Sequence, residues 1–215
     1  MSMVSDIFLQ IVLGLLTIIL FSSVHGIPQK LLAKLRNRDR PHFQSKRHFV
    51  VGAQLLARSR SAKSRSASTR LAKEAEAEAE KAIALDPKDA AAHILKALAL
   101  DLQGFNTSAL DSLDVALSPL AIKSLEDEER GDALCKRAEL KMAVNQRGGG
   151  RVDSALDDLT QALELIPKKG NAFYLLGKCY EEKKMKEEAL KAYEDALAAE
   201  PRFTVAREAL DRLSS

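Results

Sequence analysis

Apolar residues recur at spacings of three and four along most of residues 46–213, which is the period of helices that bury one side. Near the C-terminus, Phe173, Gly177 and Tyr180 share one face of an expected helix. Ala189 and Tyr193 share one face of the next helix. The charged run EEKKMKEE between them is typical of a solvated turn and a helix start. This pattern predicts two antiparallel helices within residues 170–203.

Gly177 lies in the middle of the first of these helices, where glycine costs about 1 kcal/mol relative to alanine. Small residues at Gly177 and Ala189 would let the two helices approach closely, with the aromatic residues filling the space beside them. We therefore expect Gly177 to be a contact point. Because alanine occupies the equivalent positions Ala97 and Ala138, the sequence predicts that Gly177→Ala is tolerated.

The same pattern of small and apolar residues recurs three times upstream. One copy places Ala97 twelve residues before Ala109, the same spacing as between Gly177 and Ala189. The next copy is longer, and the segment NQRGGGR at 145–151 holds the insertion. The further positions in register are Gly104, Leu113 and Ala116 in the first of these copies, Ala138, Ala155, Leu159, Ala162 and Pro167 in the longer one, and Ala75, Ala79, Ala82 and Pro87 in the earliest.

The first helix of the earliest copy is the least regular. Phe49, Ala53 and Leu56 fall at fitting positions, but Ala53 precedes Ala75 by 22 residues instead of 12. The excess coincides with the serine- and arginine-rich run SRSAKSRSAST at 59–69, which we interpret as a loop or a frayed extension of a helix.

The most regular copy resembles the tetratricopeptide repeat (TPR), whose pattern is W-x2-L-G-x2-Y, then A-x3-F, then P. Phe replaces Trp and Tyr replaces Phe at the matching positions, which are Phe173, Leu176, Gly177, Tyr180, Ala189, Tyr193, Ala196 and Pro201. The resemblance covers about residues 46–203 and implies an all-α solenoid of helical hairpins. It divides into TPR-like repeats at 46–87, 88–121, 128–167 and 170–203. A capping helix is expected at 204–215, with Val205, Leu210 and Leu213 towards one side.

The N-terminus holds an 18-residue run without a charged side chain, from Ile7 to Val24. A helix of this length spans about 27 Å, close to the hydrocarbon core of a bilayer at about 30 Å. The sequence therefore predicts a short tail at 1–6 and one transmembrane helix at 7–27. Two alternatives stay open. One is a buried core helix, and the other is a signal peptide cleaved after Gly26, although no lysine or arginine precedes the run.

The net charge of +3 conceals a strong asymmetry. Residues 25–70 hold twelve lysines and arginines and one acid, whereas residues 71–215 hold 21 lysines and arginines and 28 acids. The basic residues after the apolar run would stay cytosolic, which leaves Met1 outside. Residues 28–45 are expected to form a partly ordered basic spacer that anionic lipids attract. No aromatic platform accompanies these charges, so nucleic-acid binding is not expected.

The resemblance also implies a groove lined by the first helices of the repeats, suited to a peptide or helix with apolar anchors and some charge. TPR proteins of the chaperone-binding kind grip a C-terminal carboxylate there with asparagine and basic residues. Ile94, Leu98 and Cys135 are among the residues that stand at those positions, so binding of Hsp70 or Hsp90 tails is not expected. The expected lining is Val50, Gln54, Ile94, Leu98, Asp101, Cys135, Glu139, Met142, Asn171, Tyr174, Lys178 and Glu181.

No arrangement of residues predicts catalysis. None of the four histidines has a cysteine or carboxylate at metal-ligand spacing. Cys135 and Cys179 are expected to be small core or groove residues, because no local base accompanies them. The glycines at 148–150 lack the Lys-Ser/Thr of a phosphate-binding loop. We therefore predict no enzyme activity, no cofactor and no metal.

These observations together indicate a membrane-tethered adaptor that binds a protein segment in a TPR groove on the cytosolic face. The endoplasmic reticulum is favoured over an organelle outer membrane. Two alternatives remain open at this point. One is a secreted or lumenal TPR protein after signal cleavage, and the other is an import-receptor-like protein of an organelle outer membrane.

Overall fold

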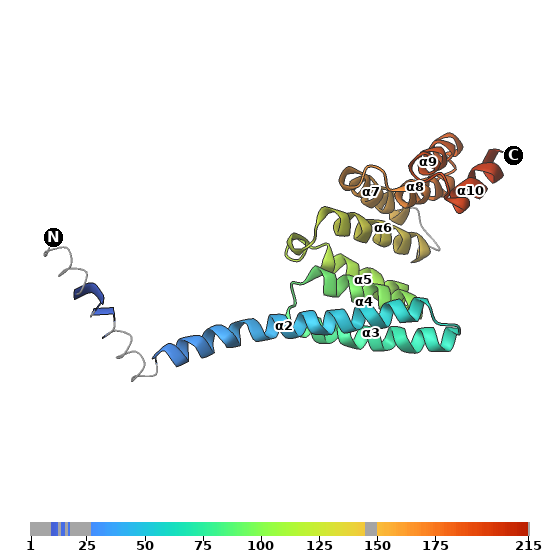
Figure 1. Cartoon of the computed structure of the whole chain (residues 1–215). Helices are drawn as coiled ribbons and strands as arrows, with labels where there is room; N and C mark the ends of the chain where they lie inside the picture. The colour runs from blue at the N-terminus through green and yellow to red at the C-terminus, as the bar shows by residue number, and fades with distance from the viewer. Residues whose placement is uncertain (1–9, 13, 16, 18–26, 145–149, 215) are drawn as a thin grey trace. The chain divides into compact units, whose positions relative to one another are not determined.

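The computed structural model describes residues 10–12, 14, 15, 17, 27–144 and 150–214, and among these no β-strand occurs (Figure 1). The chain divides into two compact units, Met1–Gln44 and Ser45–Ser215. The helices are α2 (Ile27–Arg60), α3 (Arg65–Leu85), α4 (Ala90–Gln103), α5 (Asn106–Ala116), the short 3-10 helix η1 (Ile122–Ser124), α6 (Asp127–Val144), α7 (Gly150–Leu165), α8 (Gly170–Glu182), α9 (Lys186–Ala199) and α10 (Thr204–Ser214).

Two predicted features fall largely outside the residues that the structure describes. Most of the expected transmembrane helix at 7–27 is one of them, and residues 145–149 of the glycine-rich insertion are the other. Among the described residues, no helix has the length and apolar character needed to cross a bilayer.

The first unit contains the N-terminal half of α2, and here the structure corrects the sequence analysis. Residues 28–45 were expected to be only partly ordered, but α2 is helical from Ile27 to Arg60. Pro28 fits the first turn, where its missing N–H is not needed, whereas Pro41 lies inside the helix. Leucine, alanine and lysine occupy residues 30–35 and are strong helix formers, which accounts for the correction.

The second unit is a row of antiparallel helical hairpins (Figure 1). The hairpins are formed by α4 with α5, α6 with α7 and α8 with α9, and the second helix of each packs on the first helix of the next. The part of α2 that belongs to this unit pairs with α3, since the Ser45 hydroxyl donates to the Ala82 carbonyl and the Ser59 hydroxyl donates to the Ser68 carbonyl. The last helix, α10, packs on α9.

Alanine dominates the contacts between the helices of each hairpin. The fully buried alanines recur at the positions that the repeat pattern singled out, and they include Ala75, Ala79, Ala82, Ala109, Ala116, Ala138, Ala155, Ala162, Ala189 and Ala196. A methyl group in place of a larger side chain lets two helix backbones lie close together. Larger apolar residues such as Leu113, Leu159 and Tyr193 are also fully buried, and they fill the space beside the alanines.

The register of α2 differs from the prediction by one residue. Gly52, and not Ala53, lies at the close contact with α3, because a Cβ on Gly52 would be 3.2 Å from the Ala75 carbonyl oxygen. It would also be 2.8 Å from a methyl carbon of Leu95 on α4. Gly52 is therefore the counterpart of Gly177 in this hairpin. Leu56 belongs to the same core cluster as Ala75 and Leu95, and Phe49 and Ala53 pack against that cluster.

The serine- and arginine-rich run is helical over most of its length. α2 continues to Arg60 and α3 begins at Arg65, so the turn comprises only residues 61–64. Ser64 is the N-cap of α3, and its side-chain oxygen accepts a hydrogen bond from the Ala67 backbone N–H at 3.2 Å. Of the two interpretations of this run, the helix extension is therefore the one that the structure supports.

Candidate functional site

The first helices of successive hairpins enclose a hollow with a volume of about 520 Å³. It lies within the second unit, between α2, α4 and α6, and it ends at the start of α8. Its lining residues are Phe49, Ala53, Leu56, Arg60, Ala91, Ile94, Leu95, Leu98, Leu125, Glu129, Asp132, Ala133, Cys135, Lys136, Glu139, Lys169 and Asn171. A hollow of this size is in the range of sites that hold several side chains of a ligand.

The floor of this hollow is apolar because α2 and α4 each turn one apolar face towards it. On α2, Phe49, Ala53 and Leu56 follow one another at spacings of four and three residues, which places them on one side of the helix. On α4, Ile94 and Leu98 are one turn apart and only half-buried. The exposed part of these side chains is apolar surface that a ligand would remove from water.

The rim of the hollow carries charges of both signs. Lys136 lies 2.7 Å from the Asp101 carboxylate and 3.0 Å from that of Glu139. Burial alone would lower the pKa of Lys136, but hydrogen bonds to the two carboxylates outweigh burial and raise it, so the ammonium group stays charged at neutral pH. Lys169 forms an ion pair with Asp132.

Two family models described as tetratricopeptide repeat match the chain, one over residues 60–124 and the other over residues 147–213. The chain carries tetratricopeptide repeats. The matched segments hold α3 to η1 and α7 to α10, so the expected TPR hairpins form the body of the second unit. A comparison with curated protein sequences found no match.

Solved TPR structures share this all-helical solenoid. A crystal structure of MamA is 16% identical, with a TM-score of 0.61, and the match covers 79% of this chain and 80% of MamA. MamA from Desulfovibrio magneticus RS-1 is 18% identical, with a TM-score of 0.62 and coverage of 79% and 83%. Cut9, solved with Hcn1, is 17% identical with a TM-score of 0.66, and the match covers 90% of this chain but 34% of that one. At these identities the likeness concerns the fold alone.

Five of the twelve residues predicted to line the TPR groove line the hollow, namely Ile94, Leu98, Cys135, Glu139 and Asn171. Asp101 lies beside them through its ion pair with Lys136. Val50 and Gln54 do not line the hollow, and both are exposed on another face of α2. This correction follows from the register of α2, since a shift of one residue rotates a helix by about 100°.

Met142 and Cys179 belong to the core, and Cys135 is also buried although it lines the hollow. The Met142 sulfur lies 3.3 Å from the Cys179 sulfur, and both side chains are buried between α6 and α8. Burial raises the pKa of Cys179 to about 12 and that of Cys135 to about 11. Both thiols are therefore protonated at neutral pH, which is the unreactive form.

The remaining predicted groove residues, Tyr174, Lys178 and Glu181, lie in the last repeat and do not line the hollow. The Tyr174 ring is 5.8 Å from the Tyr193 ring and 5.4 Å from the Phe203 ring, which stands edge-on to it. Glu181 accepts hydrogen bonds from the Tyr193 hydroxyl and, at 2.8 Å, from Arg212 on α10. Tyr174 and Glu181 therefore attach the capping segment to the last hairpin.

The capping helix itself corrects one expectation. α10 buries Ala206 and Ala209, whereas Val205 is 42% exposed. Small residues make the closest contacts here, as they do in the hairpins, and Leu210 and Leu213 pack around them at partial exposure.

Tyr174→Ala is expected to lower the free energy of unfolding by about 2 kcal/mol, because the half-buried ring loses its packing on Tyr193 and Phe203. Lys178→Ala is the matched control, since this side chain is exposed and its ammonium group lies 6.0 Å from the centre of the Tyr174 ring. It should change stability by less than about 0.5 kcal/mol. Urea unfolding followed by circular dichroism measures both, and equal effects of the two changes would contradict the packing role of Tyr174.

The attachment of α10 is expected to weaken in acid. Burial by itself raises the pKa of Glu181, but hydrogen bonds from Arg212 and Tyr193 outweigh it and hold the pKa below its ordinary value. A carboxylate with a lowered pKa in the folded state stabilises that state above its unfolded pKa, and this contribution is lost as the pH falls through the lowered pKa. Amide exchange in α10 should therefore accelerate as the pH falls from about 5 to about 3, after correction for the intrinsic rate.

Glu181→Gln removes the titrating group and should abolish this acid-induced step in α10. Glu188→Gln on α9 is the matched control, because Glu188 is exposed, and it should leave the step unchanged. If the amides of α10 in the unmodified chain are equally protected from exchange at both ends of the pH range, Glu181 does not control the attachment of α10.

Five charged residues of the hollow were missed at the level of sequence, namely the basic Arg60, Lys136 and Lys169 and the acidic Glu129 and Asp132. Arg60 follows Phe49, Ala53 and Leu56 at the spacing of one helical face, so the correct register of α2 would have found it. The two lysines carried no comparable signal, because their place at the rim depends on carboxylates from other helices and turns.

Proposed function

We propose that this chain is a membrane-tethered scaffold that holds a segment of another protein in the hollow of its TPR solenoid. The repeats themselves imply a protein–protein interaction scaffold, and such scaffolds are generally not enzymes. The observation that carries the proposal is the half-buried apolar floor of the hollow, formed by α2 and α4 and rimmed by charges. Cut9 is a solved example of a TPR chain that was crystallised with a protein partner.

The hollow favours a ligand of a particular chemistry. Its floor would accept two or three apolar side chains from a helix or an extended peptide, at i, i+3 or i+4 spacing in the helical case. Glu129 and Glu139 on α6 are exposed at the rim and would attract a basic residue, whereas Arg60 at the α2 end would attract an acidic one. A ligand with an acidic and a basic end would therefore bind in one direction.

Selection from a phage-displayed peptide library tests the binding site. Peptides that bind the full chain are expected to lose at least tenfold in affinity towards Leu98→Glu, because the carboxylate would be placed on the apolar floor. Asn171→Arg, at an exposed position at the edge of the hollow, should reduce binding by crowding. Val115→Glu is the matched control, because Val115 is 46% exposed on α5 and does not line the hollow. Equal binding to Leu98→Glu and Val115→Glu would exclude the hollow as the site.

The tether rests on the uncharged run from Ile7 to Val24 and on the basic residues that follow it. By this proposal the solenoid is cytosolic, at the endoplasmic reticulum membrane, and Met1 faces the lumen. The natural sequon Asn106-Thr107-Ser108 at the start of α5 should then carry no glycan in eukaryotic cells. A sequon-bearing extension before Met1 is the control, and it should be glycosylated. A glycosidase-sensitive mass shift that disappears in Asn106→Gln would instead make the body lumenal.

A further inference from the structure

Residues 45–73 carry charges of one sign only, and they comprise the solenoid part of α2, the turn and the first half of α3. Residues 45–73 contain no aspartate or glutamate, whereas residues 74–215 hold 28 acids against 20 lysines and arginines. All eight cations of residues 45–73 are exposed. We call them the basic edge, and they are Lys46, Arg47, Arg58, Arg60, Lys63, Arg65, Arg70 and Lys73.

Within the described part of the chain, no carboxylate pairs with any cation of the basic edge. Two acidic residues that contact or adjoin this hairpin have other partners. Glu78 binds His48 and Lys81, and Asp101 binds Lys136. Within the described residues, the cations of the basic edge are therefore not neutralised by ion pairs, although residues 74–215 carry more acids than lysines and arginines.

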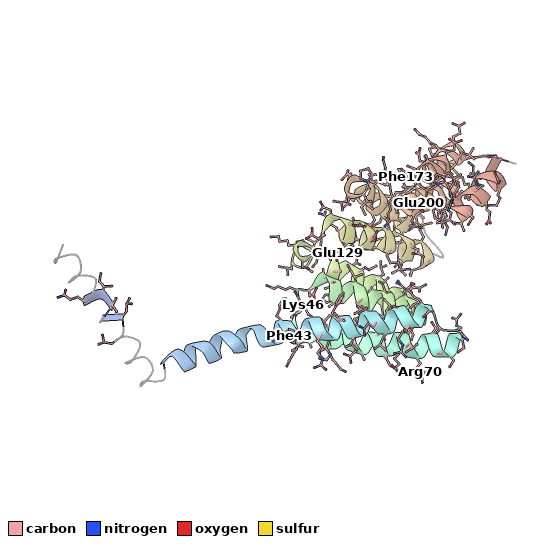
Figure 2. All side chains as sticks on the ribbon, viewed as in Figure 1. Phe43, Lys46, Arg70, Glu129, Phe173 and Glu200 are labelled. Atoms are coloured by element: carbon pink, nitrogen blue, oxygen red, sulfur yellow. The ribbon has the colours of Figure 1, made fainter. Side chains whose placement is uncertain are left out.

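The basic edge extends from Lys46 on α2 through the turn to Lys73 in the first half of α3. Lys46 and Arg70 lie towards its opposite ends (Figure 2). Arg47 and Arg58 project from the same side of α2 as Val50 and Val51, which are 50% and 39% exposed. The outer side of α2 thus combines cations with two exposed valines, and the turn at 61–64 adds further positive charge beside them.

We propose that the basic edge lies against the anionic lipid headgroups of the membrane that holds the N-terminus. This inference rests on the proposed tether. Its physical basis is charge complementarity, because each lysine or arginine near an anionic leaflet favours the contact, and seven of the eight cations do not line the hollow. The edge also follows directly on a further basic segment and the uncharged run that ends at Val24, so the tether keeps it within reach of the surface. The two exposed valines suit shallow insertion between headgroups.

A nucleic acid is the less suitable anion for this surface. Proteins that bind single strands stack bases on aromatic side chains, and Phe49 is the only phenylalanine, tyrosine or tryptophan in residues 45–73. Phe49 lines the hollow and is half-buried, so it is not available on the outer side of α2. The basic edge therefore offers charge without a stacking platform.

The experiment measures the tether and the edge separately, with the full chain and vesicles. Flotation with neutral phosphatidylcholine vesicles at high salt tests the tether, because electrostatic attraction is absent. Amine acylation followed by mass spectrometry tests the edge. On vesicles with added phosphatidylserine, Lys46, Lys63 and Lys73 should react about fivefold more slowly than on neutral vesicles. The exposed Lys184 and Lys191 of the last hairpin are internal references and should react equally on both.

Matched variants test whether the protection of the lysines from acylation depends on the positive charge of the basic edge. Arg58→Gln, Arg65→Gln and Arg70→Gln together remove three exposed cations of the edge, none of which has a partner, and should restore fast labelling of Lys63 and Lys73. The control combines Lys168→Gln, Lys186→Gln and Arg202→Gln, which remove the same charge from exposed positions elsewhere. In this control variant, Lys63 and Lys73 should still be protected from acylation on anionic vesicles. Circular dichroism checks that both variants are folded.

The outcomes separate the two proposals. If the chain floats with neutral vesicles but the edge lysines react equally on both vesicle types, the tether holds and the edge proposal is overturned. If the chain does not float with neutral vesicles, the tether is overturned, and flotation with anionic vesicles at low salt decides the edge by itself. Protection of Lys63 and Lys73 by an oligonucleotide but not by anionic vesicles would overturn the membrane assignment and make the edge a nucleic-acid surface.

Discussion

Asp158→Ala is expected to lower the free energy of unfolding by about 3–5 kcal/mol. The Asp158 side chain on α7 is buried, at 2% exposure. It accepts two hydrogen bonds from the Arg137 guanidinium, at 2.9 and 2.6 Å, and one from Lys141 at 2.6 Å. Alanine would leave both largely buried cations of α6 without their shared carboxylate, and Lys141 without any carboxylate partner, which is the main source of the loss.

Asp114→Ala is the matched control for this cluster. Asp114 also binds Arg137, at 3.1 Å, but its side chain is 55% exposed, so its removal should cost less than about 1 kcal/mol. Urea unfolding of the two variants and the unmodified chain measures the difference. If both changes cost the same, the burial of Asp158 does not determine its contribution.

Gly177→Ala is expected to destabilise the chain by about 1–3 kcal/mol, in contrast to the tolerance predicted from the repeats. A Cβ on Gly177 would lie 2.7 Å from Cδ1 and Cζ of the Tyr193 ring. The ring is fully buried, its hydroxyl donates to Glu181, and Tyr174 packs beside it, so it has little room to move. This overpacking exceeds the gain of about 1 kcal/mol that alanine brings to a helix interior.

A double-mutant cycle identifies the contact responsible. In a Tyr193→Leu background the ring is absent, so Gly177→Ala should cost at least about 1 kcal/mol less than in the unmodified chain. Thermal and urea unfolding of the four proteins give the coupling energy. A Gly177→Ala chain as stable as the unmodified one, with additive effects in the cycle, would show that the helices do not need glycine here.

The two expectations for Gly177→Ala differ because equivalent positions differ between repeats. At Ala97 and Ala138 a methyl group is accommodated, since the second helices of those hairpins place Leu113 and Leu159 where the last one places Tyr193. The sequence showed both the glycine and the tyrosine. Whether the tyrosine ring lies over the glycine depends on its rotamer and neighbours, which spacing alone does not specify.

The sequence by itself determined the helices and their pairing. Residues at i, i+3 and i+4 are neighbours on any helix, so the periodic alanines and aromatics identified the buried faces of seven helices from α3 to α9 before any contact was known. The small residues twelve positions apart likewise identified which helices approach closely, because both lie within one hairpin. These are local relations, and the chain encodes them directly.

The tertiary structure alone decided the register of α2, the residues that line the hollow and the contacts by which α10 packs on the last repeat. The long α2 and the extended α3 place Gly52 against Ala75, so spacing between the two helices no longer indicates which residues meet. Lys136 is held at the rim of the hollow by its ion pair with Asp101, and Glu181 forms an ion pair with Arg212. Each of these contacts joins side chains from helices far apart in the sequence, and their meeting depends on the angle and offset at which whole helices pack.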